Sequence, residues 1–155
     1  MPTITDVTLT KGWDLPPAQI RDKLMELQEA CLAQEQVEIP VKEYFSDGCY
    51  GREVFIPKGT CLVGEIHLDE WITVVSRGHI KIVSEEGTSI VDARKQPVTF
   101  ISPAGVKRAG YALEDTWWTM FRATPHKTTE EIRKHHIASD YEQLENHRCL
   151  GSQQP

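Results

Sequence analysis

Three acid and base side chains stand on alternate residues near the middle of the chain: Glu65, His67 and Asp69. Alternate residues of a β-strand point to one face of the sheet, so a strand over this segment would present all three together. His67 with Glu65 could act as general base and general acid, because histidine titrates near neutral pH. The trio could instead bind a divalent transition metal. Its ends lie about 13 Å apart along a strand, however, so it would converge on one ion only if the strand bends.

Short β-rich runs separated by glycine and proline fill residues 39–123 and would position this trio. Closely spaced short strands are typical of a β-sandwich or a β-barrel. We expect turns at Arg77-Gly78 and at Glu86-Gly87, since glycine adopts the positive φ that such turns need. The expected strands cover residues 53–56, 71–75, 79–83, 98–101 and 116–121.

A helix is expected before the β-rich segment. Asp14 could cap this helix, which would open near Pro16 and Pro17, where proline is tolerated. An apolar stripe recurs at helical spacing and comprises Ile20, Leu24, Leu27 and Cys31. This stripe would pack either on the chain's own barrel or on a second subunit.

A helical tail is expected after the β-rich segment. Thr128 and Glu131 fit a capping box, in which each side chain satisfies a free backbone N–H at a helix start. One face of the tail would carry Ile132, His136, Ile137 and Tyr141. We therefore divide the chain into an N-terminal arm and helix (1–36), a barrel (37–124) and a helical tail (125–155), all within one structural domain.

Composition narrows the classes of partner. The 155 residues carry a formal net charge of −6, which argues against a general nucleic-acid binder, because such a protein needs a basic face. No apolar run approaches the roughly 20 residues that span a bilayer, and Met1–Asp14 lacks the pattern of a secretion signal. No CxxC pair occurs among Cys31, Cys49, Cys61 and Cys149, so we expect reduced cysteines in a cytoplasmic protein.

Two segments of the β-rich region resemble the two motifs of the cupin superfamily. The first runs from Gly59 to Gly78, and the second is Pro103-Ala-Gly105-Val-Lys-Arg108. The resemblance implies a mostly β, double-stranded β-helix barrel. Residues 55–60, 75–78 and 102–115 also resemble small cupin-domain proteins of tailed phages and prophages, which would place the protein in the host cytoplasm.

The resemblance also implies where a metal would sit. The four metal-binding positions of a cupin fall here on Glu65, His67, Trp71 and Arg108, so only His67 keeps its type. Tryptophan is no ligand, and a guanidinium stays protonated and repels a cation. We therefore expect a degenerate metal site and favour no cofactor. If a divalent transition metal is bound, its ligands would be His67, Glu65 and Asp69.

The altered pocket suggests a small anionic ligand, such as a nucleotide or another host-defence signal. Arg108 offers a fork of donors for carboxylate or phosphate, Trp71 a flat wall and Tyr111 a hydroxyl at the rim, beside Glu65 and His67. In the competing interpretation Arg108 pairs with Glu65 or Asp69 and only fills the barrel. The alternative functions are a metal-dependent isomerase, epimerase or dioxygenase, or a structural or assembly protein of a phage; the balance leans away from an enzyme.

Two neighbouring tryptophans, Trp117 and Trp118, lie on an expected strand, so one should face inward and the other outward. An outward tryptophan, together with the apolar stripe of the first helix, favours an exposed apolar surface through which subunits associate. We therefore expect a homodimer or a larger closed assembly.

Overall fold

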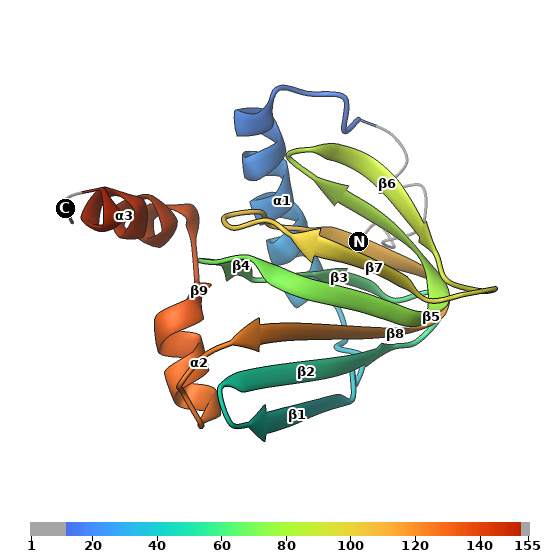
Figure 1. Ribbon diagram of the computed structural model, residues 1–155. Helices are drawn as coiled ribbons and strands as arrows, with labels where there is room; N and C mark the ends of the chain where they lie inside the picture. The colour runs from blue at the N-terminus through green and yellow to red at the C-terminus, as the bar shows by residue number, and fades with distance from the viewer. Residues whose placement is uncertain (1–11, 153–155) are drawn as a thin grey trace.

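A computed structural model describes residues 12–152 of the chain. The expectation that Met1–Asp14 carries no secretion signal, and the start of the N-terminal arm, therefore fall largely outside the described residues. The elements, in chain order, are α1 (Pro17–Leu32), β1 (Val41–Ser46), β2 (Cys49–Ile56), β3 (Cys61–Val63), β4 (Ile66–His67), β5 (Trp71–Ser84), β6 (Gly87–Asp92), β7 (Val98–Ser102), β8 (Ala109–Ala123), α2 (Thr129–His136), β9 (Ile137–Ala138) and α3 (Tyr141–Gly151) (Figure 1).

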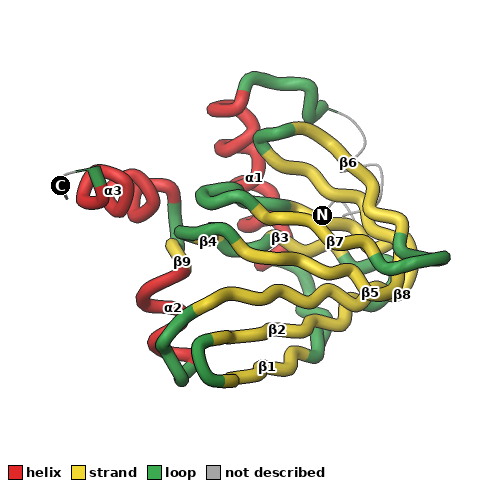
Figure 2. Tube along the Cα trace, in the orientation of Figure 1, coloured by secondary structure: helices red, strands yellow, loops and turns green. Residues whose placement is uncertain are grey.

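The predicted fold class is confirmed: the chain is mostly antiparallel β, with one helix before the strands and two helices in the C-terminal tail (Figure 2). All five expected strand segments lie within β2, β5, β7 or β8. One sheet contains seven strands, in the order β1-β2-β8-β5-β6, with β3 on β8 and β7 on β5. Within residues 12–152, no helix is long and apolar enough to cross a bilayer.

Two long strands, β5 and β8, connect the two walls of the barrel. The N-terminal part of β8 pairs with β3, whereas its C-terminal part pairs with β2. In the same way, β5 pairs first with β7 and then with β6. Because each long strand changes partner along its length, the sheet bends around an interior rather than remaining flat.

The expected turn at Arg77-Gly78 is wrong, because both residues lie inside the single strand β5. The β5–β8 register shifts on either side of Arg77, which marks a bulge. Gly78 has φ of +130°, and a Cβ on it would lie 2.4 Å from Thr116 Oγ1. Glycine is therefore needed here for both conformation and space. The expected turn at Glu86-Gly87 is confirmed, since β5 returns there as β6.

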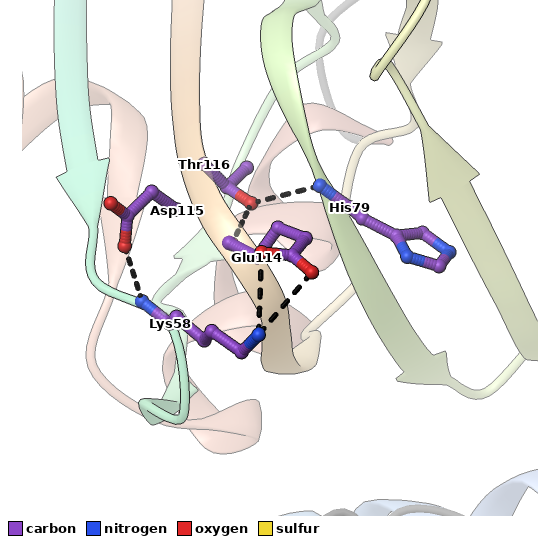
Figure 3. A network of polar contacts seen from close by, with 5 residues as sticks. All are labelled: Lys58, His79, Glu114, Asp115 and Thr116. Carbon is purple, nitrogen blue, oxygen red and sulfur yellow. Dashed lines mark hydrogen bonds and ion pairs between the residues drawn. The ribbon is translucent and has the colours of Figure 1, made fainter.

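A polar network holds this bulge (Figure 3). The His79 backbone N–H donates to Thr116 Oγ1 at 3.2 Å, and the Thr116 hydroxyl donates to the carbonyl of Glu114 at 2.8 Å. The Lys58 backbone N–H donates to Asp115 Oδ1 at 2.8 Å, which ties the loop after β2 to the same place.

Helix α1 packs on the chain's own barrel. Ile20, Leu24 and Leu27 are buried in one cluster with Val83 and Ala109, and Cys31 packs against that cluster. This contact decides between the two interpretations of the apolar stripe. The helix begins at Pro17 as expected, but the cap expected from Asp14 is wrong: the N-cap residue is Pro16, and no side chain caps it.

The tail departs from a single helix. The capping box of Thr128 and Glu131 is confirmed. The continuous face expected from Ile132 to Tyr141 is wrong, because α2 ends at His136 and the chain then forms β9 before α3. Strand β9 pairs with β4, and Ile137 lies opposite His67. This long-range pairing holds α2 at one end of the sheet, where Ile132 packs with Tyr50 and Trp71 (Figure 1).

Candidate functional site

A cavity of about 340 Å³ lies inside the barrel and is here called the main cavity. This volume is at the lower end of the range of small-molecule sites, roughly 300–1,000 Å³. Its apolar walls include Val54, Ile56, Leu62, Ile80, Ile82 and Trp118. Its polar lining comprises Arg52, Glu65, His67, Arg108 and Arg133. The walls are thus mostly hydrocarbon, with a small set of charged groups among them.

Arg108 is the predicted site residue that the structure places most clearly in the main cavity. It precedes β8 and is half-buried. Its guanidinium makes no hydrogen bond or ion pair within residues 12–152. Burial lowers the pKa of Arg108, and the charge of Glu86 partly opposes this effect. A guanidinium nevertheless stays protonated at any physiological pH, so it cannot relieve its position by losing the charge.

Neither expected partner reaches Arg108. Glu65 forms a two-pronged ion pair with Arg133 of α2, with 3.2 Å between Arg133 Nη1 and Glu65 Oε2. Asp69 lies elsewhere: its Oδ2 is 2.7 Å from His136 Nδ1 and 3.1 Å from Arg122 Nη2. The interpretation in which Arg108 is neutralised by one of these carboxylates therefore does not hold.

Glu65, His67 and Asp69 do not share one face. Strand β4 covers only Ile66 and His67, so the alternation of a strand ends before Asp69. The Leu68 backbone N–H still donates to the carbonyl of His136 at 2.9 Å, but the chain bends at Leu68 and Asp69. Only Glu65 and His67 remain in the lining.

The residues present do not fit a resident metal. Across residues 12–152, no group of three His, Cys, Asp or Glu side chains could hold one. Glu65 is engaged by Arg133, which leaves His67 as a single donor beside the cationic Arg108. One donor next to a fixed positive charge is too few for a transition-metal site, which generally has three protein ligands.

His67 is a neutral group in the main cavity. Burial, assisted by the charge of Arg108, lowers the pKa of His67 to about 4. The imidazole lies against the indole of Trp71, with 4.7 Å between ring centroids. Its ring nitrogens make no hydrogen bond within the described part of the chain. At neutral pH it can therefore offer one donor and one acceptor without adding charge.

The structure places Trp71 and Tyr111 away from the main cavity. Trp71 is 2% exposed and lines a separate chamber of about 110 Å³, here called the side chamber. Tyr111 packs against the α1 cluster on the other face of β8, because Gly110 and Ala112 take the inward positions of that strand. Trp118 supplies the aromatic wall instead, and Trp117 packs against Phe55, at 4.7 Å between centroids.

Arg52 is a lining residue that the sequence interpretation missed. It lies on β2, two residues before Val54 and four before Ile56, so all three face inward. Its guanidinium also makes no hydrogen bond or ion pair within residues 12–152. Alternation with two apolar residues was the available signal, since an arginine on the core face of a strand is unusual.

Helix α2 closes the side chamber. Thr129, Ile132 and Arg133 of this helix line it together with Tyr50. Both oxygens of Glu43 accept hydrogen bonds there, from the Tyr50 hydroxyl at 2.5 Å and the Thr129 hydroxyl at 2.7 Å. The two chambers share six lining residues and therefore adjoin; these are Val41, Arg52, Glu65, His67, Met120 and Arg133.

The fold and the site define a small antiparallel β-barrel protein with a cationic, apolar-walled cavity. No family model matches the chain, and no curated protein matches it. Among solved structures, the chain is similar to KdgF from Halomonas sp., at 17% identity over 62% of this chain and 88% of that chain, with a TM-score of 0.47. It is also similar to a cupin domain from Bordetella pertussis Tohama I, at 12% identity over 59% and 99% of the two chains, with a TM-score of 0.46.

A larger enzyme is also similar to the chain. Salicylate 1,2-dioxygenase from Pseudoaminobacter salicylatoxidans is 15% identical, with a TM-score of 0.49; 69% of this chain is covered, but only 32% of the dioxygenase. The solved structures named here are cupin-superfamily proteins, and they show no link to phages. These three identities lie below 20% and the three TM-scores below 0.5, so the similarities carry no information about function.

Proposed function

We propose that the main cavity binds a small organic anion with an apolar body, and that Arg108 is its principal anchor. The carrying observation is a half-buried guanidinium without a partner among the described residues, set among aliphatic walls. Charged groups inside proteins are normally paired, because losing water without a partner costs free energy. A ligand carboxylate or phosphate would supply that partner, and a fork of N–H donors suits its geometry.

The apolar walls restrict the ligand further. Ile80, Ile82 and Leu62 offer only dispersion and hydrophobic contact, and Trp118 offers a flat surface. Burial of hydrocarbon adds roughly 25 cal/mol for each Å² removed from water. An inorganic anion would use Arg108 but leave these walls solvated, so an organic acid is the better occupant. A nucleotide signal of host defence belongs to this class, and both that identity and the phage origin stay predictions.

Calorimetry with hexanoate and its neutral analogue hexanamide tests the proposal. The wild-type protein should bind hexanoate, while hexanamide should bind at least tenfold more weakly, because it cannot form the charge-assisted pair. Arg108→Gln should lower the affinity for hexanoate by roughly tenfold or more. Arg77→Gln is the matched control, since Arg77 is exposed and lines neither chamber.

Two results would count against this function. Equal binding of hexanoate to the wild type and Arg108→Gln would remove the role of Arg108. Near-stoichiometric iron, zinc, manganese or nickel in protein purified without chelator would instead favour the metal-dependent isomerase, epimerase or dioxygenase.

A further inference from the structure

The main cavity has two guanidinium groups to neutralise, not one. Within residues 12–152, neither Arg52 nor Arg108 has a hydrogen-bond or ion-pair partner. The third arginine of the lining, Arg133, is already paired with Glu65. His67 adds no charge at neutral pH, because its pKa lies near 4. The main cavity therefore carries two uncompensated positive charges.

The two free arginines are presented by different parts of the barrel. Arg52 lies on β2, which pairs with the C-terminal part of β8. Arg108 immediately precedes the N-terminal part of β8, which pairs with β3. Both charges lower the pKa of His67, so both act on the same interior. Two guanidinium groups held by separate parts of the barrel are better matched by two anionic groups than by one.

Within residues 12–152, no acidic side chain forms an ion pair with Arg52. Glu43 of the side chamber acts on Arg52 through its charge, but its two oxygens already accept from Tyr50 and Thr129. It forms no ion pair with Arg52 within 4.0 Å. Glu43 therefore reduces the positive potential near Arg52 without occupying its donors.

Resting on the proposed function, we infer that the ligand is an organic dianion, of which a dicarboxylate is the simplest case. One carboxylate would engage Arg108, the other Arg52, and the hydrocarbon between them would lie against Ile80, Ile82 and Val54. The cavity of about 340 Å³ suits a short chain or one ring between the two acidic groups.

The test compares hexanedioate with hexanoate, two acids of equal chain length that differ by one charge. Calorimetry is run at neutral pH on the full chain, on Arg52→Gln and Arg108→Gln, and on Arg77→Gln as the exposed control. The wild type and Arg77→Gln should prefer hexanedioate by roughly tenfold to a hundredfold, the gain of one more charge-assisted hydrogen-bonded pair. In Arg52→Gln this preference should disappear, while hexanoate binding persists through Arg108.

A second readout does not depend on any variant folding. The imidazole of His67 can be titrated by NMR in the wild type with each acid bound. Because the charge of Arg108 contributes to the low pKa of His67, a bound anion should raise that pKa, and hexanedioate should raise it further than hexanoate.

The failures are distinguishable. Equal affinity for the two acids in the wild type, with loss of both in Arg108→Gln, would overturn the dianion inference and leave the proposed function intact. If neither acid binds and His67 titrates identically with and without them, both are overturned.

Discussion

Replacing Lys107 or its neighbour Arg108 by methionine should change the stability of the fold in opposite directions. Lys107 is 1% exposed, and its ammonium donates to Gln28 Oε1 at 2.7 Å and to the carbonyl of Gly64 at 2.8 Å. Arg108 is half-buried and donates to no described residue. We expect Lys107→Met to destabilise the fold and Arg108→Met to stabilise it, each measured without ligand.

The magnitudes follow from what each side chain loses. Lys107→Met breaks two charge-assisted hydrogen bonds and leaves Gln28 and Gly64 with unsatisfied acceptors, at a net cost of about 2–4 kcal/mol. Arg108→Met breaks no hydrogen bond or ion pair with the described residues. It removes a guanidinium whose pKa is lowered by burial, so the free energy of unfolding should rise by about 1–2 kcal/mol. For a chain of this size, each kcal/mol moves the melting temperature by roughly 2–4 °C.

Urea unfolding at pH 7 with thermal melts as a second probe measures both effects. A saturating organic anion should shift the comparison in favour of the wild type by about 1.3 kcal/mol. At a ligand concentration of one hundred times the wild-type Kd, the wild type gains about 2.7 kcal/mol, whereas Arg108→Met with a tenfold weaker affinity gains about 1.4 kcal/mol. If Arg108→Met unfolds at a lower urea concentration than the wild type without ligand, Arg108 is part of the structural framework, and the reasoning that makes it a free anchor is refuted.

Three further predictions concern His67, Gly78 and the outer face of the sheet. The pKa of His67 is lowered to about 4 from an ordinary value near 6.5, so the unfolded chain takes up its proton first, and stability should fall by on the order of 3 kcal/mol as pH drops from about 6.5 to below 4. Urea midpoints across this range should therefore vary less in His67→Gln, and an unchanged profile would contradict the assignment. Gly78→Ala should lower the free energy of unfolding by about 2–4 kcal/mol in the same assay, because its Cβ would meet Thr116 at 2.4 Å and φ is +130°; a near-neutral change would mean that the bulge relaxes easily. Finally, light scattering should give at least twice the 17.6 kDa monomer mass, and Ile72→Lys should restore the monomer, since Ile72 is 48% exposed beside Phe121 of the next strand; a monomeric wild type at micromolar concentration would refute the homodimer.

The two surfaces first expected to drive oligomerisation are largely satisfied within the chain. The α1 stripe is buried against Val83 and Ala109, and Trp117 is half-buried against Phe55. Four exposed apolar residues instead form a row across the sheet: register pairs Tyr44 with Gly51, Gly51 with Phe121, Phe121 with Ile72 and Ile72 with Ile101. A row of this kind depends on the order and register of four or more strands, so no local pattern predicts it.

Elements defined by local signals were predictable from the sequence. The capping box of Thr128 and Glu131 involves residues three apart, and the strand segments carry their own β-branched and aromatic residues. Gly78 shows the limit of this approach. A glycine with positive φ serves a turn or a bulge equally well, and the difference depends on Thr116, which is distant in sequence and pairs with β5 only in the folded sheet.

The prediction that Asp69 shares one face with Glu65 and His67 was wrong for a related reason. The alternation argument assumes that a strand continues, but β4 ends after His67, and the chain bends at Leu68 and Asp69. The partner of β4 lies in a segment interpreted as one continuous helix, and the short strand β9 that interrupts this segment pairs with β4. Neither two-residue strand would form alone, so each was invisible without the other.

The charge state of the cavity depends on contacts that lie far apart in the sequence. Lys107 and Arg108 are neighbours with the same charge, but Gln28, which is 79 residues from Lys107, makes one of them structural. Arg133 similarly removes Glu65 from the reach of Arg108 by arriving on a helix 68 residues later. A sequence lists the positive and negative side chains of a barrel without saying which of them cancel. Within residues 12–152 the cancellation is incomplete, because two guanidinium groups, those of Arg52 and Arg108, remain among apolar walls without an ion-pair partner. The proposal of an organic anion as their partner depends on this imbalance.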